Sequence, residues 1–182
     1  MPSRPYLGRK IACGACALVC PARVIEFRDV VTKDKAVRKM ILHLDECHYC
    51  GQCSALCTTR DDNPPGIKHT LKFDLAGYDR ASMISETDEK ELALCEICGD
   101  VITAKAHLEW LVKKLGPLAF SNPTLFISSL KSMGFSDDVL QAASEASLAL
   151  TGAPRTDTAR GRQDRIKVLC AKCKRRATIE GN

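Results

Sequence analysis

The pattern of apolar and polar residues predicts β-strands in the first part of the chain. Apolar and β-branched residues alternate with polar ones in three stretches, at residues 24–27, 37–44 and 67–78. A turn-rich segment with two prolines and Gly66 precedes the last stretch, and it cannot continue a helix. We expect each of the three stretches to form a short strand.

Helical periodicity takes over beyond residue 100. An apolar face predicts a helix over residues 101–115, which a Gly-Pro pair ends. Shorter helical patterns cover residues 124–133 and 137–150. Residues 151–165 are polar and rich in small side chains, so we expect a loop there.

The number and spacing of the cysteines indicate metal binding in addition to these strands and helices. The chain has 182 residues, 11 of them cysteines, and each is separated from another cysteine by only two or three residues. Such spacing suits metal chelation better than disulfides, whose partners are usually distant in sequence. An odd number also argues against a closed disulfide framework. We therefore expect reduced, metal-binding cysteines and a reducing compartment, the cytosol.

The remaining composition argues against several kinds of function. The net charge of +5 is mild, and the basic cluster at residues 172–176 has no recognition helix, so no nucleic-acid interface is expected. We find no Ser/His/Asp set, phosphate loop or paired catalytic carboxylates, so the chain is expected to have no substrate-converting site of its own. The N-terminal residues lack the apolar core of a signal peptide, and no apolar run reaches the roughly 18 residues that span a bilayer.

Seven cysteines form two copies of one loop, IACGACALVCP and CHYCGQCSALC, which align 37 positions apart. The spacing C-x2-C-x2-C-x3-C is typical of cubane iron–sulfur clusters, in which three cysteines hold one cluster and the fourth holds the other. Thr58 follows the second copy where such motifs have a proline. A pair of zinc knuckles is the alternative, but two tandem motifs of this kind favour iron and sulfur.

Crossing the fourth ligands assigns the cysteines to two sites. The predicted ligand sets are Cys20, Cys47, Cys50 and Cys53 for one [4Fe–4S] cluster, and Cys13, Cys16 and Cys57 for a second cluster. The first motif position of the second set is Lys10, and a protonated amine is a poor ligand for iron. This cluster is therefore [3Fe–4S], or it takes its fourth ligand from water or another residue, or it is labile or absent.

The last four cysteines form a different constellation of two C-x2-C pairs. Together they can complete a tetrahedral site for Zn²⁺ or for a single iron, and the helical segment between the pairs would then be an insertion. Two unrelated reduced pairs, or a third cluster, are the alternatives. The four residues are Cys95, Cys98, Cys170 and Cys173.

These elements and motifs together predict an α+β fold. We expect a two-cluster (bicluster) ferredoxin-like domain at residues 1–78. A helical extension, closed by the four-cysteine metal site, is expected at residues 79–182.

The sequence also resembles known iron–sulfur subunits. IACGACALVCPARVIEF and CHYCGQCSALC are similar to two-cluster ferredoxins, and LKFDLAGYDRASM is similar to the ferredoxin-like chain of respiratory complex I. LALCEICGDVITAKAHLEWL and VLCAKCKRR resemble the iron–sulfur subunit of formate hydrogenlyase and related membrane-bound group 4 [NiFe] hydrogenases, which has the same extra cysteine pairs. The resemblance covers about the first 115 and the last 15 residues.

This resemblance implies an electron-transfer subunit inside a larger assembly. Its partners would be an electron-input iron–sulfur subunit and a small subunit that carries the cluster nearest the [NiFe] site. It would lie on the cytoplasmic face of the inner membrane and contact the membrane only indirectly. The alternatives are a soluble two-cluster carrier, a complex I-like quinone oxidoreductase subunit, and a structural zinc-binding interaction protein.

Replacing Lys10 by cysteine tests the ligand assignment of the second cluster. If this position faces the incomplete corner, Lys10→Cys converts a three-iron EPR signal into a four-iron signal, because a fourth thiolate becomes available. Arg9→Cys, one position earlier, serves as the control and should leave the signal as it is. An unchanged spectrum in Lys10→Cys would contradict the assignment.

Overall fold

The computed structural model describes residues 11–69, 77–86, 89–150 and 166–179. The chain divides into two compact units, each described here by itself. The first contains Met1–Leu92 with Ala104–His107, and the second contains Ala93–Thr103 with Leu108–Asn182. In the described ranges, no helix is long and apolar enough to cross a membrane.

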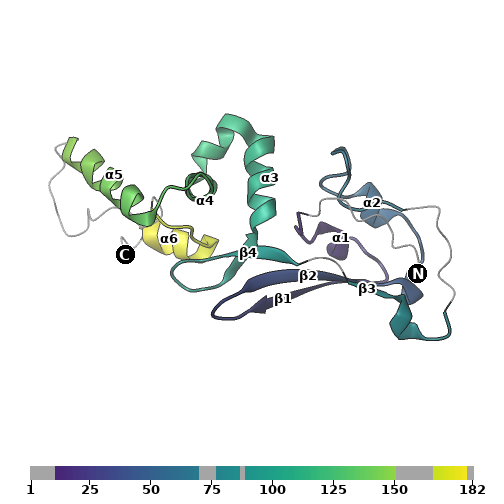
Figure 1. Ribbon diagram of the computed structural model, residues 1–182. Coiled ribbons are helices and arrows are strands. Elements are labelled where there is room, and N and C mark those ends of the chain that lie inside the picture. Colours follow the sequence, from purple (N-terminus) through teal and green to yellow (C-terminus); the bar gives the residue numbers. More distant parts are fainter. Residues whose placement is uncertain (1–10, 70–76, 87–88, 151–165, 180–182) are drawn as a thin grey trace. The chain divides into compact units, whose positions relative to one another are not determined.

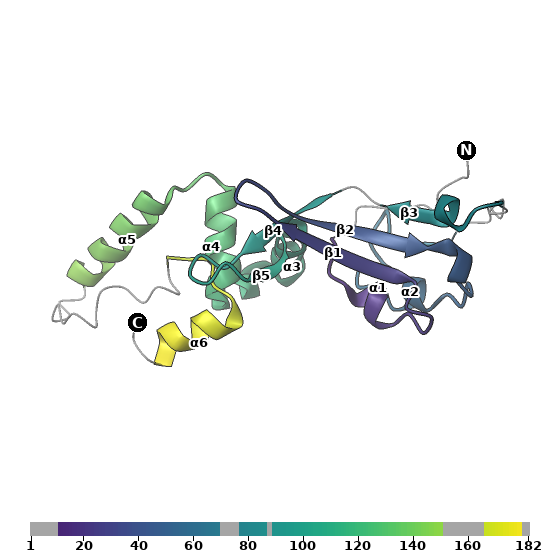
Figure 2. The ribbon, with the colours of Figure 1, turned by 90° about the horizontal axis from the view of Figure 1, so that it is seen from below.

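The first unit is built on an antiparallel hairpin (Figures 1 and 2). Strand β1 (Ile25–Val31) pairs with β2 (Ala36–His43), and the register runs from Ile25 opposite Leu42 to Val31 opposite Ala36. Strand β3 (Ile84–Glu86) pairs with the end of β2, and β4 (Lys90–Leu94) pairs with its beginning. The hairpin forms because β-branched and long apolar residues recur on both strands.

Two one-turn helices, each inside a cysteine loop, lie against this hairpin. Helix α1 (Ala15–Leu18) belongs to the first loop and α2 (Gln52–Ala55) to the second, and the two helices contact each other. Short 3-10 turns η1 (Leu44–Glu46) and η2 (Arg80–Met83) follow β2 and precede β3. The twofold sequence repeat is thus also a structural repeat (Figure 2).

A small apolar core lies behind the cysteine loops. Its buried residues come from both hairpin strands and their flanks: Val24, Ile25, Met40, Leu42 and Ile67. Five of the loop cysteines pack against this cluster: Cys16, Cys20, Cys47, Cys53 and Cys57. The core therefore shields one side of the loops from water and fixes the direction of their sulfurs.

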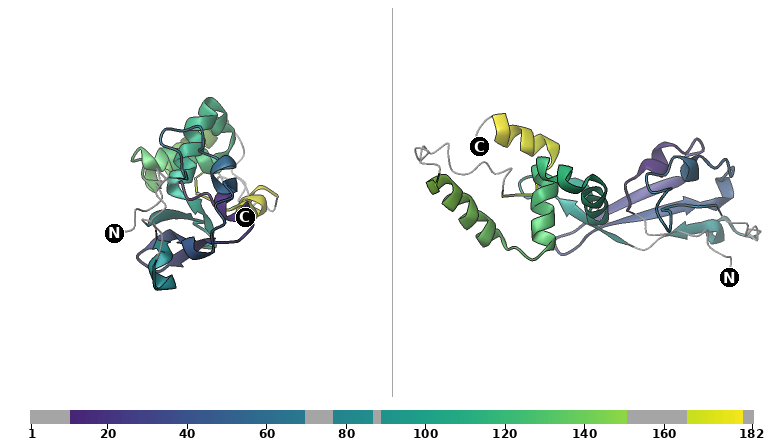
Figure 3. Two further views of the ribbon diagram at one scale, coloured as in Figure 1. Left: turned by 90° about the vertical axis from the view of Figure 1, so that its right-hand side faces the viewer. Right: turned by 90° about the horizontal axis from the view of Figure 1, so that it is seen from above.

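The second unit combines the end of β4 and strand β5 (Val101–Ala104) with helices (Figures 1 and 3). The helical elements are α3 (Lys105–Leu115, whose first turn belongs to the first unit), η3 (Gly116–Ser121), α4 (Pro123–Ser132), α5 (Asp137–Leu150) and α6 (Ala171–Ile179). Asn122 caps α4 by accepting a hydrogen bond from the Thr124 N–H at 3.1 Å.

Three small apolar clusters hold this unit together. Leu108 of α3 packs with Leu125 of α4, and Ile127 of α4 packs with Leu140 of α5. Leu169, which is 2% exposed, packs with the buried cysteines Cys95 and Cys173. The last cluster ties the segment before α6 to the loop after β4.

Most of the elements expected from the sequence are present. The strands at 24–27 and 37–44 are confirmed as β1 and β2, although β1 continues to Val31. The helices at 124–133 and 137–150 are confirmed as α4 and α5. The fold is α+β, as expected.

Other expectations were wrong or lie outside the described residues. The helix expected at 101–115 begins only at Lys105, because β-branched residues at 101–103 form strand β5 instead. Residues 67–69 are not a strand, and 70–76 of that stretch are outside the described ranges. The loop at 151–165 and position 10 lie outside them as well. The domain limit at residue 78 stays a prediction, because compactness alone does not show which segment folds independently.

We expect the apolar core behind the cysteine loops to contribute most of the free energy that stabilises the first unit. Leu42→Ala, at a residue 6% exposed, is expected to lower the free energy of unfolding by about 2–5 kcal/mol. Val31→Ala, on the neighbouring strand at 48% exposure, should change it by at most about 0.5 kcal/mol. Urea unfolding of anaerobically prepared protein measures both, and equal effects would contradict the assignment of the core.

Candidate metal centres

Both cysteine loops adopt the same unusual backbone. The residue before the second cysteine of each motif has a positive φ, 50° at Ala12 and 52° at Tyr49. The residue after that cysteine is a glycine with φ 89° at Gly14 and 78° at Gly51. Left-handed conformations cost a non-glycine residue about 1–3 kcal/mol, so their repetition indicates a shape that the loops are built to keep. Successive turns of this kind aim backbone N–H groups inward, as many iron–sulfur sites require.

The short helices then direct the remaining sulfurs. Gly14 and Gly51 are the N-caps of α1 and α2, so Cys16 and Cys53 lie in the first turn of a helix. One turn later the chain leaves the helix, and the fourth cysteine of each motif follows. The fourth cysteine of each motif, Cys20 or Cys57, therefore lies just beyond the helix that carries the third cysteine.

The structure brings together the cysteines of the first predicted set. Burial raises the pKa of the Cys53 thiol, and the charges of Cys47, Cys20 and Cys50 raise it further. Cys20 comes from the other motif, 33 positions before Cys53 in the chain. Its sulfur is thus an electrostatic neighbour of the loop that the crossed assignment pairs it with.

The described members of the second predicted set also lie close together. Burial raises the pKa of Cys16 to about 11, with contributions from the charges of Cys13 and Cys57. The same three residues line one pocket of about 390 Å³, including space open to solvent. Its other walls are largely apolar and include Ile11, Phe27, Met40 and Ile67.

This pocket fits a cluster ligated by thiolates. Three sulfurs converge on an apolar space, and such a space raises the cost of leaving their negative charges without a cation. The described lining residues include no fourth cysteine, histidine or carboxylate. The prediction about Lys10 lies outside the described residues, and the complete ligand sets stay predictions.

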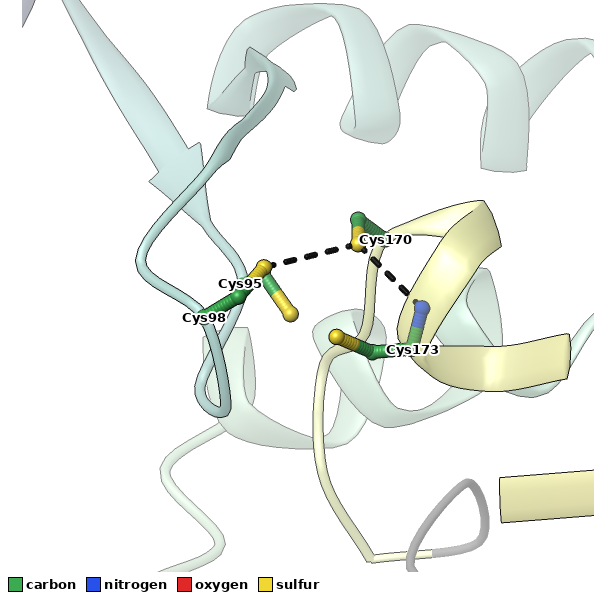
Figure 4. Close-up of side chains that lie close together, drawn as sticks. All are labelled: Cys95, Cys98, Cys170 and Cys173. Atoms are coloured by element: carbon green, nitrogen blue, oxygen red, sulfur yellow. Dashed lines mark hydrogen bonds between the residues drawn. The ribbon is translucent and has the colours of Figure 1, made fainter. Parts of the chain in front are cut away.

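The four remaining cysteines converge into one compact site (Figure 4). The Sγ atoms of Cys95, Cys98, Cys170 and Cys173 all lie within 4.8 Å of one another. Cys98 Sγ and Cys170 Sγ are 3.6 Å apart. Tetrahedral zinc with bonds of about 2.3 Å places its sulfurs about 3.8 Å apart, so the spacing fits a single ion. Among the described residues, this is the one group of potential ligands that lies close enough together to hold a single metal ion.

Two different backbone turns supply these sulfurs. The first pair lies on a tight turn in which Cys95 N–H donates to the Asp100 carbonyl and Gly99 N–H donates to the Cys95 carbonyl, both at 2.9 Å. Gly99 has a φ of 73°, which lets the turn close. The second pair begins at the N-terminus of α6, where the Cys173 N–H lies 3.5 Å from Cys170 Sγ.

Hydrogen bonds join the two turns to each other and to the helices. Glu96 N–H donates to the Val168 carbonyl at 3.1 Å, and the Thr124 hydroxyl donates to the Leu169 carbonyl at 3.1 Å. Lys131 forms ion pairs with Glu96 and Asp137. These contacts hold the two cysteine pairs in position without relying on the sulfurs themselves.

The electrostatics of this site favour a bound cation. Burial of Cys95 opposes its ionisation, but N–H groups of Cys170, Cys98 and Ile97 outweigh that effect and lower its pKa to about 6. The pKa of Cys98 is raised, as is that of Cys173, partly through hydrogen bonds within the group. The Cys95 thiolate thus forms readily, whereas the raised pKa values of Cys98 and Cys173 favour their thiol forms until a cation offsets the charge. The sulfur set suits Zn²⁺ or a single iron equally.

The structure also shows polar neighbours of the sulfurs that motif spacing could not reveal. Hydroxyl oxygens of Thr58 and Thr59 lie 3.3 Å from Cys13 Sγ and Cys57 Sγ, respectively. His69 Nε2 lies 3.6 Å from Cys53 Sγ. Only the replacement of the motif proline by Thr58 marked this region in the sequence.

Removing one sulfur tests the four-cysteine site. Cys173→Ser should reduce metal content by one ion per chain while the iron–sulfur absorbance stays, because the two kinds of site use different cysteines. Lys172→Ala, one position earlier on α6, is the matched control and should retain the ion. Metal analysis with absorbance spectra measures both. Loss of the iron–sulfur absorbance together with the ion would contradict separate sites.

Comparison with known families identifies the first of these regions. Residues 11–60 match the model of the 4Fe-4S dicluster domain. No curated protein matches the chain. The matched segment contains all seven loop cysteines and the whole β1–β2 hairpin behind them. The chain therefore contains an iron–sulfur, ferredoxin-like domain and, outside it, a four-cysteine group whose metal is not fixed by geometry.

Proposed function

We propose that this protein relays electrons through two iron–sulfur clusters as a subunit of a membrane-associated hydrogenase or formate hydrogenlyase-type complex. The observation that carries the electron-transfer part is the 4Fe-4S dicluster domain, whose two cysteine loops pack on one apolar core. Clusters of this type accept and donate single electrons at potentials set by their surroundings.

The residues of the chain do three things in this proposal. Thiolates hold the irons, and the crossed ligands tie both sites into one rigid domain. The apolar core behind the loops limits the access of water. Backbone N–H groups of the left-handed turns stabilise the negative charge on the sulfurs.

A role inside a larger assembly is supported by the second unit. Electron transfer between two clusters does not need an additional helical unit with its own metal site. Several large apolar side chains of this unit are exposed, among them Leu118, Phe120 and Met133 at 71%, 64% and 66%. Phe120 also contacts the partly exposed Phe126, with ring centroids 5.6 Å apart, and adjoining exposed apolar side chains are typical of surfaces that bind other proteins.

The proposed partners are an iron–sulfur subunit that delivers electrons and a cluster-bearing small subunit that receives them. The proposed location is the cytoplasmic face of the inner membrane, with only indirect membrane contact. The resemblance of the two extra cysteine pairs to those of group 4 hydrogenases is what favours this setting.

The proteins that copurify with this chain distinguish the proposed assembly from two other settings for electron transfer. A soluble carrier would purify alone and exchange electrons with several partners, whereas a complex I-like subunit would purify with quinone-reducing subunits. A structural protein that has lost redox function is the third alternative, and it would contain zinc but little iron.

Metal content and EPR spectra of anaerobically purified protein test the proposal. The expected content is about eight irons, or about seven if one cluster has three, plus one ion in the four-cysteine site. Reduced samples should show cluster signals at low temperature. Fewer than about four irons would rule out the relay, and purification of the tagged chain from its own cell without other redox subunits would contradict the assembly.

A further inference from the structure

Thr59 carries a buried hydroxyl group whose hydrogen has one acceptor among the described residues. Only 3% of the surface of Thr59 is exposed to solvent. The oxygen accepts a hydrogen bond from the Gly66 N–H at 2.9 Å. A threonine hydroxyl has one hydrogen to donate, and the partner left for it is Cys57 Sγ at 3.3 Å.

Gly66 allows this arrangement by having no side chain. A Cβ at that position would lie 2.4 Å from Thr59 Oγ1 and 3.3 Å from Cys57 Sγ. The chain therefore returns after the turn at Thr59–Asp62 and places a backbone donor directly on the hydroxyl. This leaves the hydroxyl oriented toward the sulfur.

Thr58 makes a second contact of the same kind in the same pocket. Its hydroxyl lies 3.3 Å from Cys13 Sγ, and both residues line the pocket around Cys13, Cys16 and Cys57. A thiolate bound to iron carries no hydrogen, so in the loaded site both hydroxyls must be the donors. A proline at position 58, as in the usual motif, could not supply this contact.

Hydrogen bonds to ligand sulfurs stabilise the more negative, reduced state of a cluster and so raise its reduction potential. We propose that Thr58 and Thr59 are tuning residues that raise the potential of the cluster held by Cys13, Cys16 and Cys57 relative to its neighbour. The inference rests on the proposed electron transfer. It adds an order of potentials: the cluster beside the threonines is the electron-accepting member of the pair.

The neighbouring site has a different donor. His69 Nε2 lies 3.6 Å from Cys53 Sγ, and the edge of its ring meets Tyr49 with centroids 5.9 Å apart. This contact is longer than the two hydroxyl contacts and its direction depends on the histidine tautomer. The hydroxyl groups of Thr58 and Thr59 have no tautomers. Their hydrogen-bond donation to the sulfurs therefore distinguishes this cluster from its neighbour whatever the state of His69.

The test is an EPR-monitored redox titration of the full chain purified without oxygen. Thr59→Val keeps the shape of the side chain and removes the hydroxyl. The reduction potential of one cluster (one redox couple) should become more negative, while that of the other cluster stays unchanged. Thr59→Ser keeps the hydroxyl and should retain the parent potential. Cys13→Ser identifies the couple, because it should alter the signal of that cluster alone.

Thr32→Val provides a matched control on the hairpin turn. The Thr32 hydroxyl also accepts a hydrogen bond from a backbone N–H, that of Lys35 at 3.1 Å, and its side-chain hydrogen bonds within the described residues are with Lys35 rather than with a sulfur. Its replacement should move neither couple. If it shifts a couple as Thr59→Val does, the inference is overturned.

Thr58→Val keeps the inference testable if Thr59→Val does not assemble its cluster. Thr58 is exposed, and its replacement should shift the same couple in the same direction. No shift in either valine variant, or equal shifts of both couples, would overturn the inference while the proposed electron transfer stands. A parent protein without two reversible couples would instead remove the proposed function itself.

Discussion

Sulfur atoms that repel one another when ionised must nevertheless converge, and this constraint organises the whole chain. Each set of cysteines is stable only if a cation offsets the charge and if the backbone holds the sulfurs in place beforehand. The two units satisfy the constraint differently. In the first, left-handed turns and one-turn helices direct sulfurs from two loops against a shared apolar core. In the second, a tight turn after β4 and the N-terminus of α6 meet around one compact site.

Much of the first unit could be predicted because its chemistry depends on local spacing. The intervals between cysteines fix which sulfurs one turn of chain can bring together, and Gly14 and Gly51 mark the turns. Alternating apolar residues marked the hairpin. Motif spacing could not identify the positive φ of Ala12 and Tyr49, since neither residue type favours it.

Parts of the second unit could not be predicted from the sequence pattern. The spacing of the two C-x2-C pairs predicted that they would meet, and they do. The pattern at 101–115 fits a helix, but pairing with β4 outweighs helical periodicity in its first four residues. Helix α6 was missed because four of its nine residues are basic and it has no apolar periodicity, and the face that packs inward is defined only by the tertiary burial of Cys173 and Ala177. Contacts between distant segments, such as Thr59 with Gly66, depend on the return path of a loop, which no local pattern contains.

The wide separation of the two cysteine pairs in the chain also affects the order in which metals can bind during protein synthesis. Cys170 follows Cys98 by 72 positions, so half of the ligands emerge from the ribosome well after the other half. At a synthesis rate of about 5–20 residues per second, the first pair waits roughly 4–14 s for the second. During that interval the apolar surfaces of α3 and α4 have no metal-closed base to pack on. The dicluster domain, whose seven loop cysteines all lie before residue 60, can acquire its irons during the same interval. Metal loading would then follow the order of translation, with the electron-transfer domain loaded before the unit that follows it.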